Sequence, residues 1–74
     1  MARLPVVSGS DLIRALKRLG YEVTRTRGSH SRLVCHGRPS LTVPLHRELD
    51  RGTLAALLKE AGLTAEHLRA LLRA

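Results

Sequence analysis

Residues Thr24–Val34 have the sequence TRTRGSHSRLV, in which a Gly-Ser pair separates two segments of strand composition. Gly28-Ser29 marks a turn. Before it, apolar and polar side chains alternate over residues 21–24, as in a half-buried strand, and residues 32–36 are predicted to form a second strand. The sequence therefore predicts a β-hairpin at the centre of the chain.

A third strand is predicted after the hairpin. Gly37-Arg38-Pro39 is typical of a second turn, and Leu41–Val43 follows with strand composition. Pro44 ends this strand because proline cannot donate a hydrogen bond to a ladder. The connections are too short for crossovers, so we expect the three strands to be antiparallel.

A helix is predicted before the strands. Residues 1–7 form a short lead-in, which Pro5 keeps outside this helix. Ser8 and Asp11 form a variant of the capping box, and Gly20 supplies a left-handed end. Between them the apolar residues recur at helical spacing: Leu12, Ile13, Leu16 and Leu19.

Two further helices are predicted after the strands. Asp50 caps the first and Gly62 ends it, while Thr64 caps a short final helix. The apolar positions of these helices are Leu54, Leu57, Leu58, Ala61, Leu68, Leu71 and Leu72.

The order of helix, three strands, helix and short helix indicates an α+β fold in one domain, residues 1–74. Helices on one face of a three-stranded antiparallel sheet would bury every apolar stripe and leave the other face open. A chain of 74 residues buries only about 60% of its unfolded surface, so we expect a small core and modest stability.

The charge of the chain favours an anionic partner. The formal net charge is +7, and eleven of the 13 basic residues are arginine. A GC-rich genome would raise the arginine content alone, but eight bases against two acids fall in residues 1–40, and five against four in residues 41–74. Codon bias would not segregate charge in this way, so we expect nucleic acid as the partner.

Other classes of site are not supported. The single Cys35 cannot form an internal disulfide, and a cysteine metal site would need a second thiol. Histidines at 30, 36 and 46 fit no standard ligand spacing, so we expect no metal and no small-molecule cofactor. No apolar run approaches about 20 residues, and no leader pattern precedes the first helix, so we expect a cytoplasmic protein without a membrane partner.

His30 is the candidate catalytic residue. If Leu33 and Cys35 of the second strand point towards the helices, His30 and Arg32 point to the open side of the sheet. Alternation cannot be carried through the turn, so it does not determine on which face of the sheet Arg25 and Arg27 lie. Both are nonetheless within a hairpin's width of His30.

One imidazole among arginines can perform ribonuclease chemistry. Imidazole can take a proton from a ribose 2′-hydroxyl, or give one to a leaving oxygen, near neutral pH. Guanidinium groups would hold phosphates and stabilise the developing charge, and Gly28 would let a phosphate approach the backbone. The pattern would be a metal-independent site, but Gly-Ser-His taken alone is a weak signal, since a turn histidine is more often structural or without a role.

The remaining histidines support weaker hypotheses. His46, after the third strand, is a candidate second acid or base, with a plain loop residue as the alternative. His36 is expected at a solvated strand end and His67 on a helix surface.

Two alternatives to an enzyme stay open. With Tyr21 as the one aromatic residue, base stacking is excluded, and a non-catalytic double-stranded RNA-binding module would act through backbone contacts. Residues 50–73 are compatible with a helix-turn-helix DNA binder. Only Arg69 and Arg73 of the last helix could contact DNA, however, and Glu66 opposes them.

Together these segments resemble the HicA family, small bacterial mRNA interferase toxins. The resemblance runs from Ser8 to Leu72. Its pieces are SGSDLIRALKRLGYE at the first helix, RTRGSH in the hairpin, LTVPLH at the third strand and LDRGTLAALLKEAGLT at the second helix. Their order and spacing carry the resemblance.

The resemblance implies a double-stranded-RNA-binding-like fold, endoribonuclease activity on mRNA, and a HicB-type antitoxin that covers the active site. It also implies that the essential histidine is His30, and that His46 matches a histidine found after Val-Pro. The residues expected to contact RNA are Arg25, Arg27, Gly28, Ser29, Arg32 and Lys17.

Overall fold

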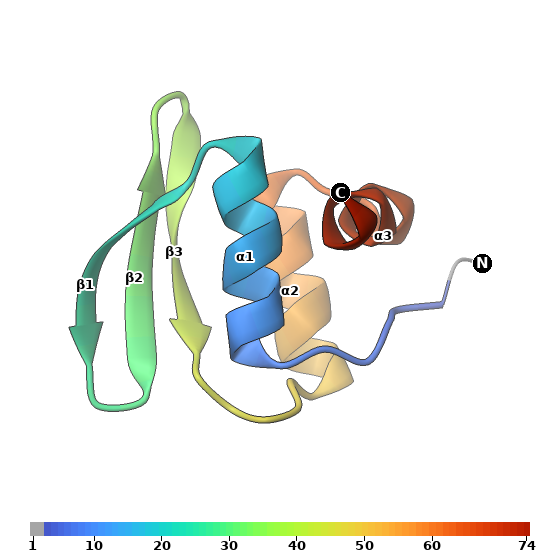
Figure 1. Ribbon diagram of the computed structural model, residues 1–74, viewed down its shortest axis with the longest axis horizontal. Coiled ribbons are helices and arrows are strands. Elements are labelled where there is room, and N and C mark those ends of the chain that lie inside the picture. Colours follow the sequence, from blue (N-terminus) through green and yellow to red (C-terminus); the bar gives the residue numbers. More distant parts are fainter. Residues whose placement is uncertain (1–2) are drawn as a thin grey trace.

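Two helices pack against one face of a three-stranded antiparallel sheet in a computed structural model that describes residues 3–74 (Figure 1). The elements are α1 (Gly9–Leu19), β1 (Glu22–Arg27), β2 (His30–Cys35), β3 (Arg38–Pro44), α2 (Arg51–Ala61) and α3 (Ala65–Arg73). This order confirms the predicted α+β fold and the short C-terminal helix, which packs against α1. Residues 3–8 have no regular secondary structure, as predicted for the lead-in, whose Met1 and Ala2 lie outside the described residues. Within residues 3–74, no helix has the length and apolar character needed to cross a membrane.

The strands are longer than the sequence predicts. β1 continues to Arg27 and β2 begins at His30, so the turn between them contains two residues. β3 begins at Arg38 rather than at Leu41. The added residues are mostly arginine, threonine and serine, whose side chains show no apolar alternation. The hydrogen bonds of the ladder, and not a hydrophobic pattern, therefore define these strand ends.

The core lies between the sheet and the helices. The sheet contributes Leu33, Leu41 and Val43, all fully buried. The buried hydrophobic residues of the helices are Leu12, Ala15, Leu16, Leu54, Leu57, Leu58, Ala61 and Leu68. Because all of these lie on one side of the sheet, its other face carries no packed layer (Figure 1).

β1 is an edge strand outside this core. Tyr21, which precedes it, is buried, and its hydroxyl donates to the Pro39 carbonyl oxygen at 2.8 Å. Val23 is 37% exposed, so the prediction of a half-buried strand over residues 21–24 is wrong for this side chain. The reason is that α1 and α2 pack over β3, at the opposite edge of the order β1-β2-β3.

The predicted helix caps are confirmed. The Ser8 hydroxyl accepts a hydrogen bond from the Asp11 backbone N–H at 3.0 Å, and the Asp11 carboxylate accepts from the Ser8 N–H at 3.3 Å. Asp50 and Thr64 cap α2 and α3. The sequence did not indicate that His67 completes the last cap, where its Nδ1 accepts from the Thr64 N–H at 3.4 Å.

Candidate active site on the open face of the sheet

The register of the β-ladder brings the predicted basic residues to one face. Ser31 and Leu33 are buried, so His30 and Arg32 point to the opposite, open face, as predicted. Arg27 pairs with His30 and Arg25 pairs with Arg32. Since directly opposed residues of a ladder share a face, both arginines of β1 lie on the open face as well.

These side chains line a shallow hollow of about 170 Å³. Its lining residues are Arg25, Arg27, His30, Arg32 and Thr42, all exposed. Arg32 Nη1 donates to Thr42 Oγ1 at 3.2 Å, which directs this guanidinium across the sheet towards β3. No carboxylate lines the hollow, so its charge is positive.

Thr42 was not predicted as part of the site. It joins the hollow because it is the ladder partner of Arg32. Its position between two buried residues of β3, Leu41 and Val43, places it on the open face by alternation. Alternation along the third strand predicts the face on which Thr42 lies, but an uncharged threonine does not by itself indicate a role in a basic site.

The Gly28-Ser29 turn connects Arg27 to His30 but does not itself line the hollow. Gly28 has a φ of +57°, which favours glycine, and an added Cβ would meet no atom within 4 Å. The backbone is therefore open to an approaching group here. The Ser29 carbonyl oxygen accepts from the Leu45 N–H at 2.6 Å, so the turn is joined to the loop that follows β3.

His46 does not line the hollow. Its carbonyl oxygen accepts from the Gly9 N–H at 2.9 Å, which holds the loop against the start of α1. The pKa of Asp50 is lowered mainly by its side-chain and backbone hydrogen bonds with Thr53, and to a smaller extent by the charge of His46. The charge of His46 therefore acts on the Asp50 carboxylate, and the role of His46 as a second acid or base stays a prediction.

Lys17 is also separate from the hollow. It lies beside the start of β1 and lines another depression with Gly20, Tyr21, Glu22 and Val23. That depression, of about 640 Å³, and one at the lead-in, of about 550 Å³, are larger than the hollow at His30. Neither contains a histidine, so chemistry rather than size distinguishes the site.

A further depression, of about 290 Å³, contains His67 and Arg38, but its other lining residues are apolar or glycine. There, Arg38 Nη1 donates to the Ala61 carbonyl oxygen at 2.7 Å.

Residues 3–74 contain no group of three side chains that could hold a metal ion. The helix-turn-helix hypothesis places α3 as a DNA-reading helix, but Leu68 of α3 is fully buried and Arg69 is half-buried. α3 completes the core, and Arg73 is its one fully exposed arginine.

Comparisons with known proteins agree with the fold. The chain matches the family model described as "HicA toxin of bacterial toxin-antitoxin" over residues 9–63. It is similar to a solved chain from a toxin-antitoxin complex of Streptococcus pneumoniae, with 31% identity and a TM-score of 0.68. The similarity covers 77% of this chain and 98% of that one. No curated protein matches the chain. All residues of the hollow fall within the matched range, whereas α3 lies beyond it.

Proposed function

The chain belongs to the HicA family of toxins from bacterial toxin–antitoxin systems, and on this premise we propose that it is an endoribonuclease that cleaves mRNA. His30 is its general acid–base residue. Arg25, Arg27 and Arg32, with the Gly28-Ser29 turn, hold the phosphates around the bond to be cleaved. Lys17 contacts the RNA further away.

The observation that carries this proposal is the composition of the hollow at the hairpin. One exposed imidazole lies among three guanidinium groups, and no carboxylate lines the same space. Guanidinium groups bind phosphate oxygens through two parallel hydrogen bonds, so they would position a phosphodiester over the imidazole. A phosphate held there would also be close to the exposed Gly28 backbone.

The chemistry balances without a metal ion or a cofactor. His30 takes the proton of the ribose 2′-hydroxyl, and the 2′ oxygen forms a bond to the adjacent phosphorus. The bond from phosphorus to the 5′ oxygen breaks, and that oxygen receives a proton by way of solvent. The arginines stabilise the extra negative charge on the phosphoryl oxygens during this step. The products are a 2′,3′-cyclic phosphate and a 5′-hydroxyl.

The proposed protein partner is a HicB-type antitoxin that covers the hollow. A toxin with a net charge of +7 attracts an acidic partner at long range, and covering His30 would exclude RNA. A HicB-type antitoxin that binds this chain should therefore stop cleavage when it is added at equal concentration.

Incubation of labelled RNA with the pure protein in EDTA tests the proposed activity. We expect the RNA to be shortened, with cyclic phosphate at the new 3′ ends, and we expect His30→Ala to prevent shortening. RNA that is retarded in a gel but keeps its length would show a binding module without catalysis, and the enzyme would have to be abandoned.

A further inference from the structure

A second basic surface lies on the helical side of the molecule. Arg14, Lys17 and Arg18 are exposed on α1, and their spacing of three and four residues places them on one stripe. This stripe is opposite the buried residues Leu12, Ala15 and Leu16.

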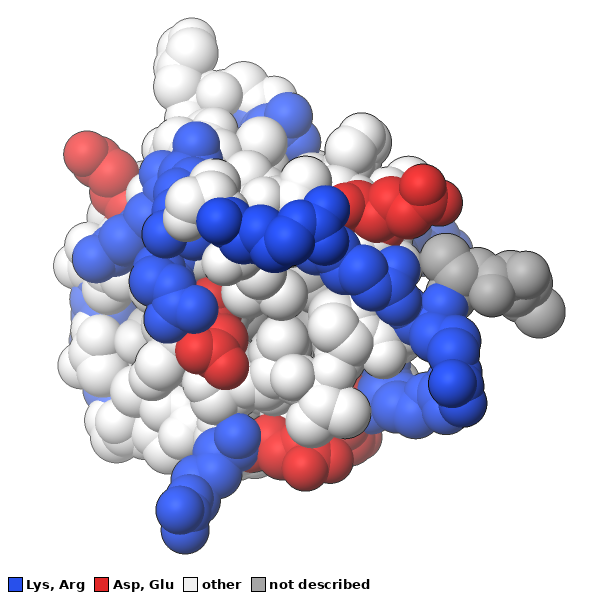
Figure 2. Space-filling model, turned by 45° about the vertical axis from the view of Figure 1, so that its right-hand side comes forward, with Lys and Arg blue, Asp and Glu red and all other residues white. Residues whose placement is uncertain are grey.

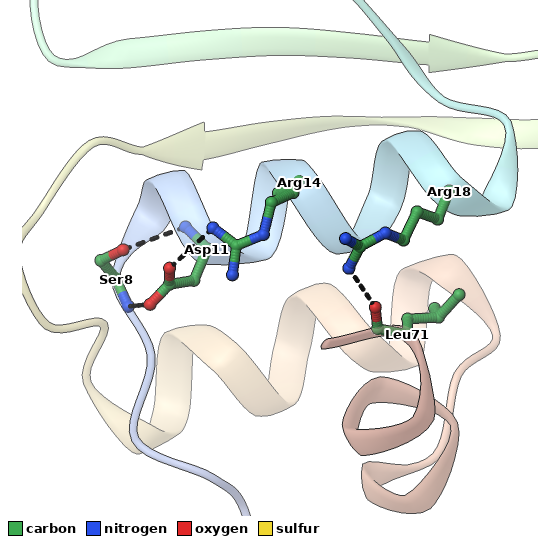
Figure 3. Close-up of polar contacts among 5 residues, drawn as sticks. All are labelled: Ser8, Asp11, Arg14, Arg18 and Leu71. Atoms are coloured by element: carbon green, nitrogen blue, oxygen red, sulfur yellow. Dashed lines mark hydrogen bonds and ion pairs between the residues drawn. The ribbon is translucent and has the colours of Figure 1, made fainter. Parts of the chain in front are cut away.

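The last turn of α3 lies beside this stripe. Arg18 Nη1 donates to the Leu71 carbonyl oxygen at 2.5 Å, which joins the outer side of α1 to the last turn of α3 (Figure 3). Arg73, two residues further along α3, is exposed. Figure 2 shows lysine and arginine side chains in a band across the face on which α1 and α3 lie. We call the set Arg14, Lys17, Arg18 and Arg73 the helical basic surface.

Acidic residues neutralise this surface only in part. Asp11 pairs with Arg14 at 3.2 Å, and both side chains are exposed, so the pair is weak (Figure 3). Glu22 lies near Lys17 and lines the same depression. Even when Asp11, Glu22 and Glu66 of α3 are counted against them, the four basic residues leave a net positive charge, and the weak pair leaves Arg14 able to bind a phosphate.

The helical basic surface connects to the hollow along β1. Lys17 lies beside Glu22 and Val23, where β1 begins, and Arg25 and Arg27 follow on the same strand. β1 has no buried residue, so no part of the protein blocks a ligand that passes along this edge. A flexible polyanion bound at the hollow on the open face could therefore continue along β1 to the helical basic surface.

We infer that the helical basic surface binds the phosphate backbone of the RNA beyond the segment held at His30. This inference deepens the proposed function, since it takes RNA as the substrate. It assigns a role to α3, which lies outside the range matched by the family model and which supplies Arg73.

The character of the surface favours a nucleic acid over an acidic protein. Protein interfaces place apolar or aromatic side chains at their centre. The exposed large apolar residues of the described chain are Val6, Val23 and Leu45, and none of them lies on α1 or α3. A mostly apolar depression of about 290 Å³ lies between α1 and α3, but none of the four residues of the helical basic surface lines it. Exposed arginines and a lysine that do not surround an apolar centre are typical of sequence-independent phosphate contacts.

The test measures RNA affinity as a function of salt, in a His30→Ala background that keeps the RNA intact. Arg14→Gln/Arg73→Gln removes two charges from the surface and spares Arg18, which holds α3. The matched control, Arg51→Gln/Lys59→Gln, removes two exposed charges from α2. Two single-stranded RNAs are used, of about 4 and about 20 nucleotides, which bracket the usual site size of a small domain.

We expect the surface variant to reduce the slope of log K against log salt by about 1.4 for the long RNA, since each phosphate contact contributes about 0.7. The slope for the short RNA should not change, nor should either slope in the control. If the surface variant and the control have equal salt slopes for the long RNA, the inference is overturned. It is also overturned if the surface variant binds RNA like the wild type but loses affinity for the antitoxin. If the expected slopes are found but the wild-type protein leaves RNA uncut, the proposed activity fails while this RNA-binding surface stands.

Discussion

Gly9→Ala should destabilise the protein, because Gly9 is the point at which α1 meets the loop after β3. Gly9 is buried, and its N–H donates to the His46 carbonyl oxygen at 2.9 Å. A Cβ at this position would overlap the Pro44 carbonyl oxygen and approach the Leu45 Cα to 3.0 Å. The obstructing atoms belong to the backbone, so no side-chain rotation relieves the overlap.

The size of the effect follows from two opposed terms. Forcing an extra methyl group into a packed site costs about 1–3 kcal/mol, and a backbone obstruction belongs near the upper end. Replacing glycine by alanine in a helix returns up to about 1 kcal/mol. The net loss is about 1–2 kcal/mol, which lowers the Tm of a domain of this size by about 4–16 °C.

Gly52→Ala is the matched control for this substitution. Gly52 lies in the first turn of α2, and an added Cβ there would meet no atom within 4 Å. The same chemical change should therefore raise the Tm by a few degrees. Thermal unfolding followed by circular dichroism measures both variants. A Tm for Gly9→Ala at or above that of the wild type would refute the close approach of α1 to residues 44–45.

Three further predictions concern the cap of α1 and the basic hollow. Ser8→Ala removes the hydroxyl that caps α1 and should cost about 1 kcal/mol in urea unfolding, whereas Ser10→Ala, at an exposed helical position, should change little. Hydrogen bonds with the Ser8 backbone and hydroxyl hold the pKa of Asp11 below its ordinary value of 3.8, so the stabilisation by this carboxylate is complete above that pH and is lost as the pH falls through the lowered pKa. Asp11→Asn should accordingly flatten the acid limb of a Tm-against-pH curve, and an unchanged limb would show that other carboxylates account for it. Arg27→Gln should reduce the salt slope of single-stranded RNA binding by about 0.7, and Lys59→Gln should not; identical slopes would exclude Arg27 from phosphate contact.

The helices could be predicted from sequence because their signals are local. The caps Ser8, Asp50 and Thr64 were each found from a side chain that bonds to a backbone three residues away. The glycine ends were found from their need for a positive φ. Such signals do not depend on the rest of the fold.

The composition of the site depended on non-local pairing. Arg25 and Arg27 could be assigned to the open face only from their ladder partners, Arg32 and His30. The exposure of Val23 followed from the placement of the helices over β3, and the absence of His46 from the lining of the hollow depended on the path of the loop after β3. Alternation within one strand predicts a face but not which strands the helices cover.

The rate of RNA cleavage by His30→Ala, under single-turnover conditions with saturating protein, tests the central claim most directly. His36→Ala is the control, because His36 is exposed in the turn between β2 and β3 and does not line the hollow. General acid–base catalysis contributes about 10²–10⁴-fold, so the His30 variant should cut at least about 100-fold more slowly than the wild type while binding RNA equally well. The His36 variant should cut at the wild-type rate. A His30 variant that also cuts at that rate would contradict the account.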